Sequence, residues 1–213
     1  MKDSAAARMI ALAGLARVLD VPVARIEYLL EVSAEDLTTF RHQVVDHLFG
    51  AVTTAGFSRI VAATRVLPAP VAAKVATHNN SPLMTAHLAT AMETSRALGV
   101  AKRLPAAFLA QVAAYLDLRR SAPLIAGLPA TLAAAVAREL ADRQDWLTLG
   151  ELIEITSDDQ LTRCLSALDA GEIVTLASHS NDPAMSDRIA GMVSEPLAEQ
   201  LRGTAMSAGE AEG

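Results

Sequence analysis

Apolar residues along this chain recur at intervals of three and four, the spacing that places them on one side of an α-helix. No segment shows the alternation of apolar and polar residues that a half-buried β-strand needs. Prolines and short polar stretches interrupt the pattern often, so we expect many short helices and an all-α fold. The expected helices span residues 4–19, 22–31, 34–49, 52–66, 68–78, 82–98, 105–117, 121–127, 129–143, 148–156, 158–169, 171–179, 183–193 and 195–202.

Three of these helices share a ten-residue pattern that opens with Leu-Pro-Ala. The copies begin at Leu67, Leu104 and Leu128 and read LPAPVAAKVA, LPAAFLAQVA and LPATLAAAVA. Proline is tolerated at the start of a helix because its missing N–H would have no intrahelical partner there. Each copy therefore predicts the first helix of a helix pair. The prolines are separated by 37 and 24 residues, so the array is irregular and its first unit carries a longer second helix.

Each copy presents two apolar sides. Counted from the proline, the third, fourth and seventh positions form a bulky stripe, and the first, fifth and eighth positions are alanine in all three copies. A helix with two apolar sides has to lie between two neighbours, which favours a stack of helix pairs, a short α-solenoid. The bulky stripe comprises Val71, Ala72 and Val75 in the first copy, Phe108, Leu109 and Val112 in the second, and Leu132, Ala133 and Val136 in the third.

The helix pairs punctuated by Leu-Pro-Ala, with an acidic helix start at Ser157-Asp158-Asp159-Gln160-Leu161, resemble a known repeat. They are similar to the α-helical repeats of the cytoplasmic N-terminal domain of MgtE-type magnesium transporters and, more loosely, to HEAT-type arrays. The resemblance covers about residues 67–177 and implies an architecture of stacked helices. Transport and magnesium sensing do not carry over, because these helices hold fewer acidic residues and no membrane-spanning region follows them.

The chain divides into three expected regions. Residues 1–66 form an N-terminal helical region, and residues 67–202 form the repeat region, packed on it as one elongated body. Residues 203–213 read GTAMSAGEAEG, which offers little apolar surface to bury, so we expect a disordered tail.

Composition narrows the function classes. The net charge of −6 argues against a broad surface for nucleic acid, and the longest charge-free stretch, residues 121–137, is interrupted by two prolines, so no membrane span is expected. The only cysteine, Cys164, excludes an internal disulfide and lies on an apolar helix face, where an inert thiol is expected. Together with the preference for arginine over lysine and the lack of a secretory signal, this favours a bacterial cytoplasmic protein.

Residues near the N-terminus offer an alternative function. Ala16, Asp20 and Ile26 match the spacing of a helix-turn-helix, with Asp20 at the left-handed turn. The recognition helix over residues 23–31 would bring two glutamates and one arginine to a phosphate-lined groove, which favours an ordinary hairpin. A DNA-binding regulator is therefore the second hypothesis, and nucleic acid is not the expected partner.

Catalytic and metal-binding patterns are few. His42 and Asp46 are four residues apart on one helix face, which is half of a metal site, but the remaining ligands are missing from their surroundings in the sequence. No glycine-rich phosphate loop, serine elbow or cysteine–histidine pairing is present. We expect no catalytic residue, cofactor or metal.

The turns of the second and third helix pairs supply the expected contact surface. Asp117, Arg119 and Arg120 lie in the loop YLDLRRSAP, where adjacent arginines could bind a carboxylate or phosphate of a partner, or one could cap the preceding helix. Trp146 lies at the next such turn, where it is either an interface anchor or buried beneath the turn. The sequence thus predicts a non-enzymatic adaptor or regulatory subunit that binds a protein partner, and it leaves assembly of identical copies open.

Overall fold

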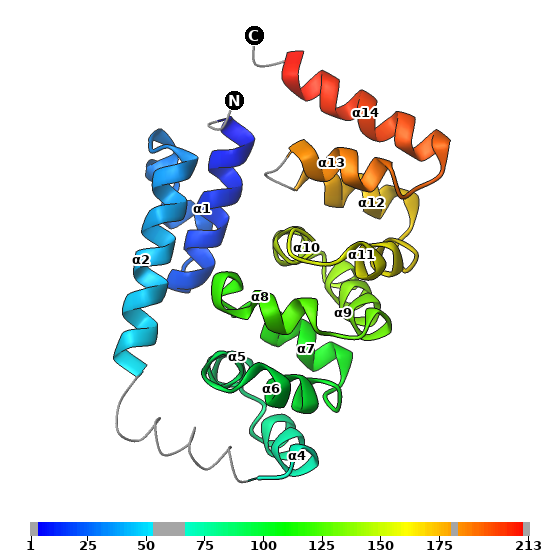
Figure 1. The fold of residues 1–213 in the computed structure, drawn as a ribbon. Helices are drawn as coiled ribbons and strands as arrows, with labels where there is room; N and C mark the ends of the chain where they lie inside the picture. Colours follow the sequence, from blue (N-terminus) through cyan, green and yellow to red (C-terminus); the bar gives the residue numbers. More distant parts are fainter. Residues whose placement is uncertain (1–3, 53–66, 180–182, 211–213) are drawn as a thin grey trace.

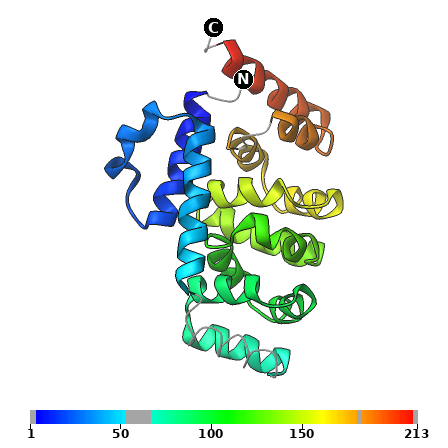
Figure 2. The same cartoon turned by 60° about the vertical axis from the view of Figure 1, so that its left-hand side comes forward.

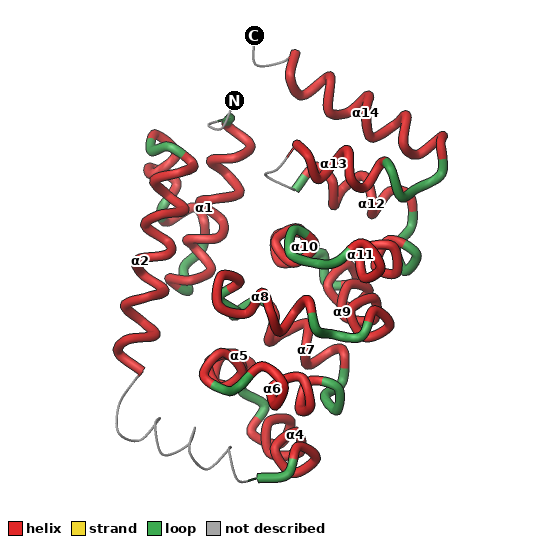
Figure 3. The backbone as a smooth tube through the Cα atoms, viewed as in Figure 1, coloured by secondary structure: helices red, strands yellow, loops and turns green. Residues whose placement is uncertain are grey.

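The computed structural model describes residues 4–52, 67–179 and 183–210, and within them the protein is all-α, as the sequence predicts. Figure 3 shows helices joined by loops, with no strand in these ranges. The helix expected over 52–66 lies, apart from its first residue, outside the described residues. The elements are α1 (Ala5–Leu19), two 3₁₀-helices, η1 (Val23–Arg25) and η2 (Glu27–Glu31), then α2 (Ala34–Val52), α4 (Ala69–Asn79), α5 (Pro82–Ala91), α6 (Thr94–Ala101), α7 (Ala106–Ala113), α8 (Leu118–Ala126), α9 (Ala130–Asp142), α10 (Trp146–Ile153), α11 (Asp158–Leu165), α12 (Ala170–Ser178), α13 (Pro183–Ala190) and α14 (Glu195–Glu210).

The helices from α4 to α14 form a stack, which we call the array (Figure 1). A helix of the array packs on the helix two places later in the chain, so that the array contains two series of stacked helices. The even series runs through α4, α6, α8, α10, α12 and α14, and the odd series through α5, α7, α9 and α11. Helices α1 and α2 lie side by side and run in the same direction, because the chain turns back after α1 and returns through η1 and η2 before α2 begins (Figures 1 and 2). We call this unit, residues 4–52, the hairpin, and it lies alongside the array.

The prediction of one helix over residues 22–31 is wrong. These residues form the two short 3₁₀-helices η1 and η2 instead of one α-helix. Pro22 stands immediately before them in extended backbone, and the β-branched Val23 and Ile26 favour α-helix weakly, so no regular helix develops. Asp20 does adopt the left-handed conformation expected of it, with φ 54° and ψ 45°, and ends α1.

The longer second helix predicted over 82–98 is also wrong. It is broken at Met92 and Glu93, both in extended backbone, into α5 and α6. Thr94 and Ser95 follow, residue types that favour helix starts over helix interiors, and the Ser95 hydroxyl bonds the Glu93 carboxylate. Two helices, α5 and α6, instead of one therefore separate the first Leu-Pro-Ala copy from the second.

This extra helix places the first copy in the other series. The second and third copies, α7 and α9, pack on each other in the odd series, whereas α4 packs on α6 in the even series. At the end of the described array, α4 buries Ala72 and Ala73 but leaves Val71 and Val75 45% and 47% exposed. The bulky stripe is thus buried or half-buried in the second and third copies and largely open in the first.

The alanine stripe behaves as predicted in all three copies. Each of its nine alanines is buried or half-buried: Ala69, Ala73, Ala76, Ala106, Ala110, Ala113, Ala130, Ala134 and Ala137. Small side chains let neighbouring helices approach closely, so the smooth side of each copy is its packing side. In all three copies the proline is the residue before the first helical residue, in extended backbone, and the helix begins at the following alanine.

The last helix extends further than expected. A disordered tail was predicted from residue 203, but α14 continues to Glu210. Alanine and methionine in this stretch are strong helix formers, so the helix can continue once its first turns are packed on α12 and α13. None of the described helices is both long enough and apolar enough to cross a lipid bilayer.

Glu172, in the first turn of α12, is expected to make folding stability depend on pH. Its carboxylate accepts hydrogen bonds from Arg138 (2.7 Å) and from the backbone N–H of Asp169 (2.8 Å), and these bonds lower the pKa of Glu172 to about 2. A lowered pKa stabilises the fold fully above the unfolded carboxyl's value of 4.5, and the gain is lost as pH falls toward 2. In urea unfolding, Glu172→Gln should therefore cost about 1 kcal/mol at pH 7 and clearly less at pH 3. The same cost at both pH values would contradict this assignment.

Candidate functional site

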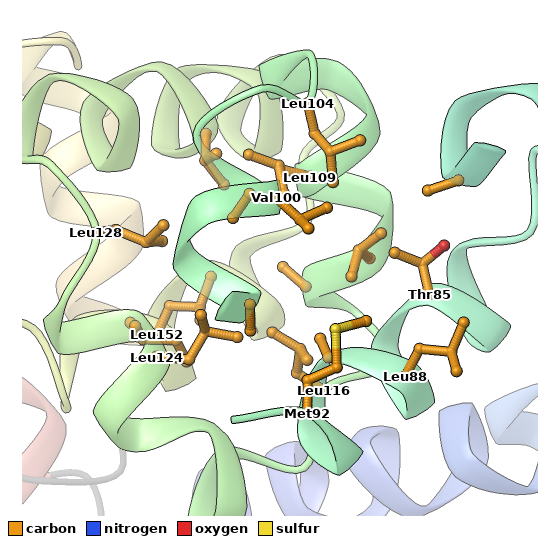
Figure 4. Close-up of a pocket in the computed structure, with 18 of the residues that line it drawn as sticks. Thr85, Leu88, Met92, Val100, Leu104, Leu109, Leu116, Leu124, Leu128 and Leu152 are labelled. Carbon is orange, nitrogen blue, oxygen red and sulfur yellow. The ribbon is translucent and has the colours of Figure 1, made fainter. Parts of the chain in front are cut away.

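A cavity of about 570 Å³ lies within the array and is lined by residues of helices α4 to α11 and the turns between them. Its volume is in the range of known ligand-binding pockets. Figure 4 shows aliphatic side chains from successive helices around it, among them Leu88 of α5, Val100 of α6, Leu109 of α7, Leu124 of α8 and Leu152 of α10.

The cavity exists because many of its wall positions carry alanine. A methyl side chain allows close packing on one side of a helix, but it cannot fill the space between helices that diverge on the other side. Leucine or methionine at these positions would occupy much of the volume. The alanines in the wall are Ala72, Ala76, Ala89, Ala97, Ala101, Ala113, Ala133 and Ala137.

Among the described residues that line this cavity, one cysteine is the only residue with an ionisable side chain. The hydroxyl of Thr85 donates to the carbonyl of Ser81 (2.9 Å), and that of Thr156 donates to the carbonyl of Ile153 (2.8 Å). These hydroxyls therefore serve the backbone of their own helices. The wall offers apolar contact and contains no carboxylate, imidazole or amine that could transfer a proton.

Cys164 of α11 is the cysteine in the wall, and it is 3% exposed. Burial raises the pKa of its thiol to about 11, so the thiol is neutral at pH 7. A neutral thiol is a poor nucleophile. Its position on the apolar face of its helix is as the sequence predicts, and it contributes to the cavity as a small apolar group.

The cavity continues onto an exposed apolar surface. Val75 of α4 and Met84 of α5 line it and are 47% and 40% exposed. Val71, one turn before Val75 on the same face of α4, is 45% exposed. We call the cavity together with Val71, Val75 and Met84 the apolar groove. It lies at the end of the array where the first Leu-Pro-Ala copy has changed series.

The structure places Asp117, Arg119 and Arg120 at the start of α8, in contact with the hairpin. The Asp117 side chain is buried, caps α8 by accepting from the Arg119 N–H (3.2 Å), and pairs with both guanidinium groups (3.2 and 3.4 Å). Both arginines also pair with Asp46 of α2, at 3.1 and 2.9 Å. The charges expected to bind a partner are therefore used within the chain, and binding of a partner at this turn stays a prediction.

Trp146 is the first residue of α10 and is half-buried against the larger core of the array. It lies after Asp145, whose carboxylate accepts from the Thr148 N–H and so caps the helix. The indole ring packs partly against the larger core, so Trp146 does not project freely into solvent as an interface anchor would. The sequence left open whether Trp146 is exposed or buried, and the structure shows a half-buried side chain.

The remaining sequence candidates do not form sites. Burial, followed by Arg119 and Arg41, lowers the pKa of His42, and Asp46 pairs with arginines rather than completing a metal site. Within the described ranges no three histidine, cysteine, aspartate or glutamate side chains are grouped so as to hold a metal. The short 3₁₀-helices at residues 23–31 do not provide the recognition α-helix that the DNA-binding hypothesis requires.

No family model matches the chain, and the searches of curated proteins and of solved structures returned no match either. The resemblance to the MgtE-type repeat therefore stays a prediction. The sequence did not indicate the apolar groove as a site, and of the nine alanines in the stripe only Ala76, Ala113 and Ala137 line its cavity.

Proposed function

We propose that the protein is a non-enzymatic adaptor that binds a partner protein by taking the apolar side chains of an amphipathic helix into the apolar groove. The observation that carries this proposal is a cavity without acid–base groups that opens onto exposed aliphatic side chains. Helix-in-groove recognition uses such a surface, with anchors spaced three and four residues apart. The sequence also favours an adaptor, but it predicted a contact surface at the turns of the array, whereas the surface proposed here is the groove at the end of the array.

The surroundings of the cavity favour a helix over a small ligand. A small apolar molecule would fill the cavity and leave Val71, Val75 and Met84 in water. A helix laid across the opening would cover these side chains and insert its own into the cavity, so it would bury more apolar surface. The partner segment that fits has one aliphatic face and one polar face.

An occupant would also repair a packing defect. Empty space in a protein core costs roughly 24 cal/mol per Å³, so even part of this volume would cost several kcal/mol, against a total stability of about 5–15 kcal/mol. Water would recover little of this, because the wall offers few hydrogen-bonding partners. Apolar side chains from a partner would restore the missing contacts.

Photo-crosslinking in the producing cells tests the proposal. A photoreactive side chain is placed at Met84, in the groove, and at Ala91, on the same helix but outside it. We expect a different protein to crosslink at Met84 and not at Ala91, through a segment with an amphipathic helical pattern, and the corresponding synthetic peptide to bind the purified protein. A crosslink only to a lipid, only to a second copy of this chain, or equally from both positions would contradict the proposal.

Filling the groove from inside is expected to abolish peptide binding without loss of stability. Ala89 of α5 lines the cavity and is half-buried, so tryptophan there would occupy the space that the partner's side chains need. We expect Ala89→Trp to weaken binding of the crosslinked peptide at least about tenfold, with an unchanged or raised melting temperature. Ala91→Trp, which adds the same bulk on the exposed side of α5, is the matched control. Calorimetric titration that shows equal affinities for both variants would contradict the assigned site.

A further inference from the structure

The hairpin has an apolar core of its own. Its buried residues are Ala11, Leu12, Leu15, Ala16, Ile26, Ala34 and Leu37, and the apolar residues packed against them also belong to residues 7–32. The array has two cores, and these share Leu109 and Leu116. Among the described residues, no side chain is shared between the hairpin core and either core of the array. The described core of the hairpin is therefore formed by the hairpin's own residues.

Ion pairs connect the two parts. On one side, Arg17 of α1 pairs with Asp145 (2.6 Å) and bonds the hydroxyl of Thr148, and Arg41 of α2 pairs with Glu151 of α10. A further pairing has the opposite arrangement of charges: the carboxylate belongs to the hairpin, and Asp46 of α2 pairs with Arg119 and Arg120 of α8. The paired side chains are 19–48% exposed, so water and salt reach them.

Gly14 makes room for one of these pairs. A Cβ atom at Gly14 of α1 would lie 2.5 Å from Nη1 of Arg41, so the arginine passes over α1 at the one place without a side chain. There it reaches Glu151 of the array. The hairpin is thus shaped to present this charge to the array, although its described core is formed by its own residues.

We propose that the α1–α2 hairpin is a detachable arm, held on the array by the pairs Arg17–Asp145, Arg41–Glu151 and Asp46 with Arg119 and Arg120. Exposed ion pairs contribute little each and weaken as salt screens them, so a contact held by such pairs can open while the core of each part stays intact. Release exposes the faces of α8 and α10 that the arm covers. None of the paired residues lines the apolar groove, so release of the arm can be measured without a binding partner.

Distances between spin labels test the arm. The variant Cys164→Ala removes the native thiol, and cysteines at the exposed residues Glu35 of α2 and Lys102 after α6 carry the labels. At low salt we expect one narrow distance distribution, and at about 1 M NaCl, where the Debye length falls to about 3 Å, a second population at longer distance. Arg41→Glu should raise the released fraction about fivefold at low salt, because it turns an attraction into a repulsion.

The reversed pair separates an ionic arm from a general loss of structure. Combining Arg41→Glu with Glu151→Arg restores opposite charges across the contact and is expected to restore the narrow distribution. Arg202→Glu, which makes the same charge change in the exposed Arg202–Glu195 pair of α14, should leave the distances unchanged. Distances that respond neither to salt nor to Arg41→Glu, or a double variant as open as the single one, would overturn the proposal.

Discussion

Aspartate at Val136 is expected to destabilise the array strongly, whereas aspartate at Val75 changes its stability little. The two valines hold the same position in the Leu-Pro-Ala pattern, seven residues after the proline. Val136 of α9 is 7% exposed within the larger core, and Val75 of α4 is 47% exposed. An unpaired carboxylate at the buried site should cost about 3–5 kcal/mol, and at the open site less than about 1 kcal/mol.

Urea unfolding followed by circular dichroism measures both costs. Both variants replace valine by aspartate at the same position of the repeat. A difference between their free energies of unfolding therefore reflects the different burial of the two valines. The expected difference arises from the extra helix that moves α4 into the even series. Equal costs for the two variants would contradict this arrangement. Val75→Asp, which stays folded, also places a charge at the edge of the apolar groove and should weaken binding of the partner peptide.

Replacing Gln160 by leucine is expected to be among the most damaging substitutions of a polar residue. Gln160 is 2% exposed, and its amide NH₂ donates to the carbonyls of Ile125 (2.9 Å) and Leu128 (2.8 Å) at the turn between α8 and α9. Its amide oxygen accepts from the N–H of Ser157 (3.0 Å), which completes the capping box at the start of α11. Leucine leaves all of these buried groups without their partner, so we expect a loss of about 2–4 kcal/mol in chemical unfolding.

Glutamate at the same position separates the two roles of Gln160. Gln160→Glu keeps the oxygen that accepts from Ser157 but removes the two N–H donors and brings a carboxylate against backbone carbonyls. It should therefore destabilise at least as much as leucine at pH 7, and less at pH 4, where the carboxyl approaches neutrality. Glu172 holds the same capping position in α12, where its partner is Arg138 instead of carbonyls. A Gln160→Glu variant as stable as the wild type would show that the amide donors contribute nothing.

The sequence predicted the features that depend on neighbouring residues. The helix starts at the three prolines, the burial of the alanine stripe and the helix start after Ser157 each follow from spacing within about ten residues. The break at Met92 and Glu93 was missed because the apolar period of α5 continues through it. The 3₁₀-helices at residues 23–31 were missed because their spacing also fits an α-helix.

The candidate site was not predictable to the same extent. The roles of Arg119 and Arg120 depend on Asp46, which is more than seventy residues away in the chain and is brought close only by docking of the hairpin. The apolar groove depends on distances between helices, and a sequence pattern does not specify these. An alanine can lie where two helices pack closely or where a cavity remains between them. The alanine stripe therefore predicted contact between helices but could not predict the cavity beside it.

Accessibility of the groove in the free protein is measured most directly by thiol reaction rates. In the Cys164→Ala background, Ala89→Cys places a thiol in the cavity wall, and Ala110→Cys places one on the alanine stripe at a position 1% exposed and outside the cavity. With a small uncharged thiol reagent, we predict that the cysteine at position 89 reacts on the order of a hundredfold faster, because the cysteine at 110 must wait for local unfolding. Equally slow reaction at both positions would mean that the groove is closed in solution, which would contradict the binding site.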